Sequence, residues 1–317
     1  MFSMLLKPAA SALLLSSLLA QSPTSDSGWA PQTRLPAARA GSTASTVNGI
    51  VYLIAGSSAP GVPTASVLTF NPATGIWARG EKLPVATNQP ASCVLNGEIH
   101  VLGGIPVAGG ATALHWLFDT SNGVWEARAP MPTARGNAGA AVLNGLIHVV
   151  GGQTTGSGAT QFSTHEVYDP LTDSWATLAP ISPARAGLGL ISHAGNLYAI
   201  GGALADNSTN YKIVEIYDSA TNQWQAVASM PTARSNFGVA LMNGRIHAVG
   251  GGYLNAPALK MHEIYDIVSN SWSTGVDIPT GRQSMGFTLA NGSMLAIGGI
   301  VNAGGTHTKV VEQYLFQ

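Results

Sequence analysis

The sequence predicts an all-β chain built from six copies of one unit. A glycine pair, or Ala-Gly in the first copy, returns every 48 to 50 residues from Gly56 to Gly299. A tryptophan returns with the same period from Trp77 to Trp272, and an aromatic residue precedes each of these tryptophans by seven positions. A repeat near 50 residues with this content is typical of a propeller in which each unit forms one blade. We therefore predict a six-bladed β-propeller.

Each unit contains the pattern of four antiparallel strands. In the third unit, the apolar runs at residues 139–143 and 146–150 are separated only by Asn-Gly. Asn-Gly favours the tight turn that joins two twisted strands, because both residues tolerate positive φ. After a variable loop, T-H-E-V-Y-D reads as a third strand, P-L-T-D as a turn, and a fourth strand opens at Ser174-Trp175. Four such strands make one blade.

The two ends of the chain predict how the ring closes. The sixth unit ends at Gln317, before the place where its tryptophan would fall, whereas Trp29 lies 48 residues before Trp77. We expect the strand around Trp29 to supply the outer strand of the last blade. Such a closure leaves no unpaired sheet edge, which is otherwise a site of aggregation.

The repeat resembles the kelch motif. The string M-P-T-A-R, an apolar run, N-G, I-H/Y and G-G, followed by E-V-Y-D and a tryptophan, stands at residues 131–175 and 230–272. The resemblance extends over residues 29–316. It implies four-stranded kelch blades around a central channel. Kelch propellers serve both as binding proteins and as enzymes, so the resemblance does not by itself fix the function.

The N-terminal residues have the sequence pattern of a secretory signal peptide. Lys7 precedes an apolar run at residues 9–20, with small residues near a plausible cleavage site. The run is too short to span a bilayer comfortably. We predict a signal peptide at residues 1–22, a single propeller at residues 23–317, and an exported protein, secreted or periplasmic, that is not inserted in a membrane after cleavage.

Composition excludes several classes of function. Charged residues make up 9% of the chain and the formal net charge is −1, which argues against a nucleic-acid partner. Cys93 is the single cysteine, so no intramolecular disulfide or thiolate cluster is possible. His100, His148 and His247 share one repeat position and are too far apart to bind one zinc ion. We predict no metal site, no cofactor and no nucleophile–base motif.

The arginines of the repeat are the strongest candidates for a binding site. Five share the position just before the innermost strand of a blade: Arg39, Arg135, Arg185, Arg234 and Arg282. We expect them to ring one mouth of the channel, where guanidinium groups bind carboxylates with two parallel hydrogen bonds. The ligand would then be an anionic small molecule such as a sugar acid, or the acidic peptide of a protein partner. In the alternative, each arginine pairs with the glutamate that opens the third strand of its own blade.

Blades one and two depart from this pattern. Blade one has Arg39 but Leu68 in place of the glutamate, and blade two has Thr87 and Trp116 in place of both residues. Trp116 either stacks on a sugar ring or fills space between blades. Tyr253, in a variable loop predicted on the same face, completes the candidate ligand-binding residues.

We therefore predict a binding or interaction module with its site at the channel mouth. A second hypothesis is an enzyme, because exported six-bladed kelch proteins include the periplasmic N-acetylneuraminate epimerase. That resemblance implies an acid and a base near the anomeric centre of a sugar acid, for which His115, His165 and His262 are candidates. A third hypothesis is a structural or adhesive surface module.

Overall fold

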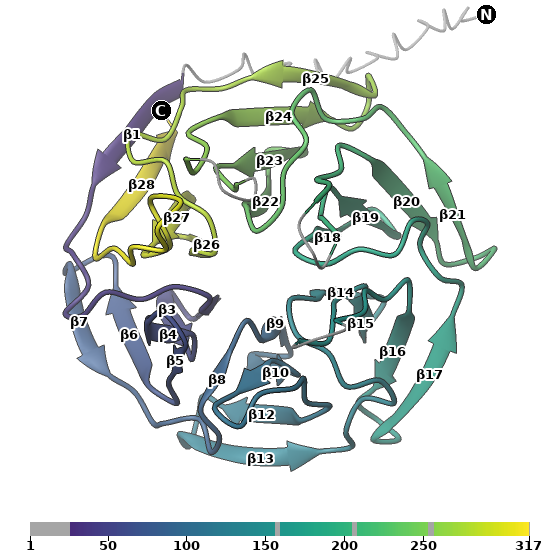
Figure 1. Ribbon diagram of the computed structural model, residues 1–317, viewed down its shortest axis with the longest axis horizontal. Helices are drawn as coiled ribbons and strands as arrows, with labels where there is room; N and C mark the ends of the chain where they lie inside the picture. The colour runs from purple at the N-terminus through teal and green to yellow at the C-terminus, as the bar shows by residue number, and fades with distance from the viewer. Residues whose placement is uncertain (1–25, 156–158, 205–207, 253–256, 317) are drawn as a thin grey trace, which may run out of the picture.

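The structure, a computed structural model, describes residues 26–155, 159–204, 208–252 and 257–316. The signal peptide predicted at residues 1–22 and Tyr253 lie outside these ranges. The described chain forms six four-stranded antiparallel sheets arranged around one axis, and thus an all-β six-bladed propeller as predicted (Figure 1). The search for a helix that could cross a bilayer found none in the described ranges.

Every blade runs from an inner strand at the channel to an outer strand at the rim. The strands of blades 1 to 3, from inside to outside, are as follows. Blade 1 comprises β2 (Thr43–Val47), β3 (Ile50–Ile54), β6 (Val67–Asn71) and β7 (Ile76–Arg79). Blade 2 comprises β9 (Ala91–Leu95), β10 (Glu98–Leu102), β12 (His115–Asp119) and β13 (Val124–Arg128). Blade 3 comprises β14 (Gly139–Leu143), β15 (Leu146–Val150), β16 (His165–Asp169) and β17 (Ser174–Leu178).

Blades 4 and 5 repeat this order, and blade 6 takes its outer strand from the start of the described chain. Blade 4 comprises β18 (Gly189–His193), β19 (Asn196–Ile200), β20 (Val214–Asp218) and β21 (Gln223–Ala226). Blade 5 comprises β22 (Gly238–Met242), β23 (Arg245–Val249), β24 (His262–Asp266) and β25 (Ser271–Thr274). Blade 6 comprises β26 (Gly286–Ala290), β27 (Ser293–Ile297), β28 (Val311–Phe316) and β1 (Asp26–Pro31). Two short ribbons pair β4 (Ser57–Ala59) with β5 (Val62–Pro63), and β8 (Thr87–Asn88) with β11 (Ile105–Pro106).

The predicted two-residue turns join the first and second strands of the blades. In blade 3, Asn144 has a φ of 52° and Gly145 a φ of 77°, the backbone conformation that this hairpin turn requires. In blade 4, Ala194 takes the asparagine position with a φ of 47°. The turn is therefore set by position in the repeat, and even alanine adopts its left-handed conformation.

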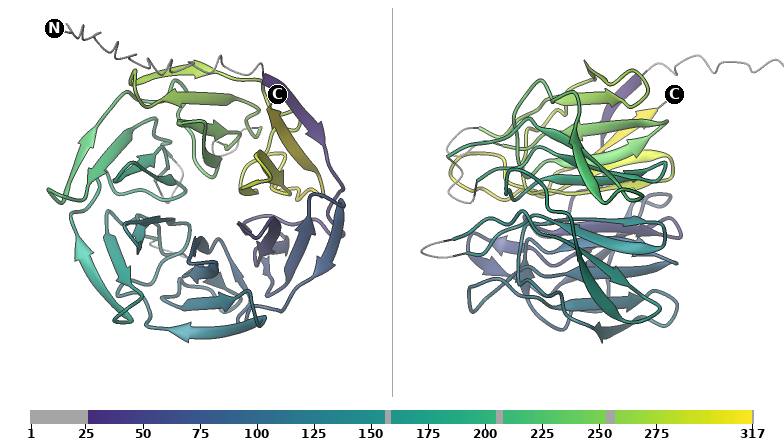
Figure 2. Two further views of the ribbon diagram at one scale, coloured as in Figure 1. Left: turned by 180° about the vertical axis from the view of Figure 1, so that it is seen from behind. Right: turned by 90° about the vertical axis from the view of Figure 1, so that its right-hand side faces the viewer.

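The ring closes as the tryptophan count predicts. β1 pairs antiparallel with β28, so the two ends of the described chain lie side by side in blade 6 (Figure 2). Trp29 stands opposite Tyr314, the same pairing that joins Tyr168 to Trp175 in blade 3. The residues before the first blade thus complete the last one.

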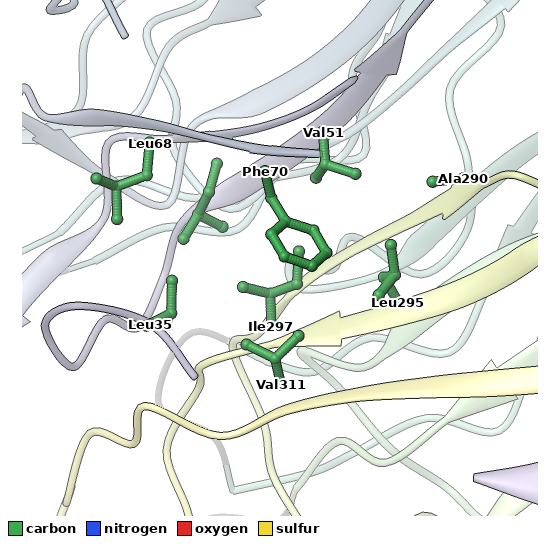
Figure 3. Close-up of a cluster of buried hydrophobic side chains, with 9 residues drawn as sticks. Leu35, Val51, Leu68, Phe70, Ala290, Leu295, Ile297 and Val311 are labelled. Carbon is green, nitrogen blue, oxygen red and sulfur yellow. The ribbon is translucent and has the colours of Figure 1, made fainter. Parts of the chain in front are cut away.

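The hydrophobic core consists of clusters between adjacent blades. At the junction of blades 6 and 1, Phe70 points toward Ile297 and Val311, and Leu68 lies with Leu35 in the same cluster (Figure 3). All five side chains are buried. Since each blade buries one face against the next, a blade becomes stable only within the ring. The inner strands contact one another around the channel, which places the residues just before them at its mouth.

Candidate functional site

Four of the five predicted arginines are completely buried, and each forms an ion pair with a glutamate of its own blade. The nitrogen–oxygen distance is 2.7 Å in the pairs Arg135–Glu166, Arg185–Glu215 and Arg234–Glu263, and the fourth pair is Arg282–Glu312. The side chains of these arginines have 0% exposure. This is the geometry of the bracing alternative, and the binding of a ligand by these four arginines stays a prediction.

The second oxygen of each carboxylate is also bound. In blade 3, Glu166 accepts a 2.6 Å hydrogen bond from the Thr133 hydroxyl, in addition to that from Arg135. Thr232 binds Glu263 in the same way in blade 5. Burial lowers the pKa of Arg135 to about 10 and Glu166 opposes that shift, so the guanidinium stays charged at neutral pH. The arginine, the hydroxyl and the carboxylate tie the segment before the inner strand to the third strand.

Arg39 in blade 1 is the exception. It is 5% exposed, and Leu68 stands where the other blades have glutamate. Its guanidinium donates to the carbonyl of Ala55 at 2.9 Å, and to the carbonyl and the hydroxyl of Ser66 at 3.4 and 3.3 Å. Burial alone lowers its pKa. Arg39 therefore lacks the carboxylate that the four arginines above share.

Trp116 in blade 2 packs between blades. It lies half-buried against a cluster that includes Leu83 and Val101, beside a hollow of about 10 Å³ that Thr87 also lines. The indole N–H and the Thr87 hydroxyl have no hydrogen-bond partner among the described residues. Such a volume accommodates about one water molecule. The position agrees with the space-filling alternative, and stacking on a sugar stays a prediction.

A second ring of residues, two positions after the arginines, surrounds the channel mouth. We call it the mouth ring, and its members are Gly41, Gln89, Asn137, Gly187, Asn236 and Ser284. All six have positive φ, between 52° and 64°. The backbone N–H of each donates to the carbonyl of the member in the preceding blade, at 2.7 to 2.9 Å. Since Gly41 donates to Ser284, the six hydrogen bonds form a closed circle that joins all the blades.

The mouth ring bounds a hollow on the axis. The hollow has a volume of about 110 Å³ and is lined by the mouth ring and by the residue that follows each member: Ser42, Pro90, Ala138, Leu188, Phe237 and Met285. The Asn137 and Asn236 side chains flank Gly187, because a Cβ there would lie 2.8 Å from the Asn236 oxygen and 3.2 Å from the Asn137 nitrogen. The polar groups of this site are thus neutral carboxamides and hydroxyls, with apolar side chains beside them.

The histidines singled out by the repeat lie inside the blades. Three hydrogen-bonded pairs form across the second and third strands, with distances between ring nitrogens of 2.8, 2.8 and 2.9 Å: His100–His115, His148–His165 and His247–His262. All six are at most 4% exposed. Burial lowers the pKa of His148 to about 4 and that of His165 to about 3. None of the three proposed acid–base histidines lines the hollow.

The described ranges contain no group of three or more His, Cys, Asp or Glu side chains suited to hold a metal ion. The kelch motif matches three segments of the chain, residues 38–84, 134–182 and 184–231. These segments fall on blades 1, 3 and 4 and their linkers, and the remaining blades repeat the same four strands. The chain is a kelch-repeat β-propeller.

A solved structure described as "Structure of YjhT" is similar to this kelch propeller. It has 17% sequence identity and a TM-score of 0.76, over 88% of this chain and 95% of that one. At this identity the likeness shows the fold alone. The search of curated proteins gave no match.

The sequence analysis did not identify the mouth ring. A signal was present, since Gly and Asn fill four of its six positions and both tolerate positive φ. Gln89 and Ser284 interrupt this signal, because neither residue type is typical of positive φ. In this kelch propeller four of the five arginines form ion pairs within their blades, and the neutral residues two positions after the arginines bound the hollow.

Proposed function

We propose that this protein is an exported binding module whose ligand docks in the hollow bounded by the mouth ring. The observation that carries the proposal is that all six blades contribute one residue each to a polar ring around the axis. Such a ring is preorganised, since its backbone hydrogen bonds fix the backbone from which the side chains project before any ligand arrives. Preorganisation lowers the entropy that binding would otherwise cost.

The chemistry of the hollow favours a polar ligand with a small apolar part. The carboxamides of Gln89, Asn137 and Asn236 each offer both a donor and an acceptor. Phe237 and Met285 supply apolar surface at the same level. A sugar, or the polar side chain of a protein partner, matches this combination. A sugar acid or an acidic peptide would bind through the carboxamide N–H groups, because the four paired arginines are already neutralised.

Binding without chemistry is favoured over catalysis by the lining residues. General acid–base catalysis needs a titratable side chain within hydrogen-bond reach of the substrate. The twelve residues that line the hollow are Gly, Ser, Gln, Pro, Asn, Ala, Leu, Phe and Met, without any such side chain. The epimerase hypothesis therefore requires its acid and base from outside this lining.

The test is a thermal unfolding series of the mature protein with N-acetylneuraminic acid, N-acetylmannosamine and a glutamate-rich peptide. A ligand at 100 times its Kd adds about 2.7 kcal/mol to the free energy of unfolding. Asn137→Gly and Asn236→Gly remove the carboxamides and keep the positive φ, so they should abolish the shift with little loss of stability. Gln225→Ala, on the exposed outer strand of blade 4, is the matched control and should retain it.

Two results would count against this proposal. If the Asn→Gly variants kept the full shift with a ligand that stabilises the parent, the ligand would bind elsewhere. If the protein accelerated exchange between the anomers of N-acetylneuraminic acid, followed by proton NMR, the protein would be an enzyme.

A further inference from the structure

Blade 1 contains a buried cation without a counter-ion. Of the residues that the structure describes, none places a carboxylate within 4 Å of Arg39, whereas the arginine of blades 3 to 6 pairs with a glutamate. Only neutral oxygens of Ala55 and Ser66 accept hydrogen bonds from its guanidinium, and the Nε–H has no partner. A buried charge without a partner is costly, which makes this site unusual.

The other blades show which group this environment accepts. In blade 3 a guanidinium and a hydroxyl, from Arg135 and Thr133, together bind the Glu166 carboxylate. Blade 5 repeats this arrangement with Arg234, Thr232 and Glu263. The arginine at this position of the repeat thus binds a carboxylate, which the third strand of the same blade supplies.

Blade 1 retains the guanidinium and lacks both the carboxylate and the threonine. Ala37 replaces the threonine, but the Ser66 hydroxyl accepts from Arg39 Nη2 at 3.3 Å and keeps its own proton available to donate. Leu68, at the glutamate position, lies in the apolar cluster with Leu35 (Figure 3). A guanidinium and a hydroxyl therefore lie together, as in blades 3 and 5.

The site also lies closer to solvent than its equivalents. Arg39 retains 5% exposure, against 0% for the other four arginines, and Ser66 is half-buried. Arg39 is thus the one of these five arginines that keeps some solvent-exposed surface. The Arg39–Ser66 site is separate from the hollow, since neither residue lines it.

We propose that Arg39 and Ser66 form a binding site for a carboxylate that comes from outside the chain. The Arg39 guanidinium supplies the charge and the Ser66 hydroxyl supplies a second donor. The ligand supplies the carboxylate that glutamate supplies in blades 3 to 6. Its source is either a free small carboxylic acid or the acidic side chain of a peptide.

The test compares thermal unfolding in sodium acetate and in sodium chloride at equal ionic strength. The parent protein should unfold about 3 °C higher in acetate at a concentration well above its Kd. Leu68→Glu supplies the missing carboxylate, so it should raise Tm in chloride and remove the acetate response. Leu68→Gln, of the same size without the charge, should keep the response. Any shift that remains in Leu68→Glu measures the non-specific effect of acetate.

Two further variants test the carboxylate site independently. If Leu68→Glu does not fold, Ala37→Thr/Leu68→Glu rebuilds the full arrangement of blade 3. Independently, Ser66→Ala should weaken the acetate response and leave the rest of blade 1 unchanged. Equal Tm of the parent in acetate and chloride, or a response unchanged by Leu68→Glu, would overturn the proposal. Acetyl-glutamate amide distinguishes the sources: if it gives the shift at lower concentration than acetate, the ligand is a peptide side chain.

Discussion

Trp29 stands directly opposite Tyr314 in blade 6, with the two ring centroids 5.1 Å apart. The Trp29 indole also donates a 2.9 Å hydrogen bond to the carbonyl of Val276, beyond the outer strand of blade 5. One residue from the beginning of the described chain therefore joins the last blade to its neighbour. The pairing of its strand, β1, with β28 closes the ring.

We expect Trp29→Ala to lower the free energy of unfolding by about 3 kcal/mol, since it removes a large aromatic side chain and a hydrogen bond. Urea denaturation measures the loss. Leu171→Ala is the control, because Leu171 is 93% exposed and its truncation should change the stability by less than about 0.5 kcal/mol. A similar loss in both variants would contradict the closing role of Trp29.

The Arg–Glu pairs should behave as braces that need both partners. Glu166→Leu leaves the charge of Arg135 buried and unpaired, so we expect a loss of about 3 to 5 kcal/mol. Removing both charges in Arg135→Met/Glu166→Leu should restore most of this stability. A double-mutant cycle by chemical denaturation gives the coupling energy, and additive losses would show that the two residues do not act as a pair.

The buried histidine pairs predict that acid weakens the fold. In the folded state the pKa values of His148 and His165 are about 4 and 3, whereas an unfolded histidine titrates near 6.5. As the pH falls below 6.5, the unfolded chain gains protons that the folded chain does not bind. The free energy of unfolding should therefore decrease from pH 6.5 to about pH 4 and stay constant with respect to these groups above pH 7.

A control for this pH dependence exists within the protein. Blade 4 has Tyr198 and Val214 at the two positions of the pair. His148→Tyr/His165→Val copies that arrangement into blade 3 and should reduce the slope of stability against pH between 6.5 and 4. Urea unfolding at four pH values in this range measures the slope. An unchanged slope would assign the acid sensitivity to other groups.

Gly187 tests the geometry of the mouth ring. It has a φ of 64°, and the Cβ of an alanine would lie 2.8 Å from the Asn236 side-chain oxygen. Gly187→Ala should therefore destabilise the protein by about 1 kcal/mol and displace the Asn236 carboxamide. Gly145→Ala, also at positive φ but with open space around its Cβ, controls for backbone strain alone. Equal losses in both variants would show that the ring side chains are not fixed.

The histidines show which features of the blades could be predicted from the sequence and which could not. The repeat showed that His100, His148 and His247 alternate with tyrosine, and it assigned them to the blade, where they lie in the second strands. It did not show that each of them pairs with the histidine that opens the third strand. That pairing depends on the register of two strands that are separated by 12 to 14 residues of variable sequence, and tertiary structure sets this register.

The sequence by itself determined the number of blades, their internal turns and the closure through Trp29, because these follow from period, local turn chemistry and the position of one residue in the repeat. Only the tertiary structure decided which polar groups face the channel. The mouth ring forms from hydrogen bonds between residues 48 to 50 positions apart, and between Gly41 and Ser284. The tertiary structure also decided the partners of the five arginines. Four of them pair with a glutamate, since a charge removed from water requires a partner. Arg39 has no carboxylate partner among the described residues.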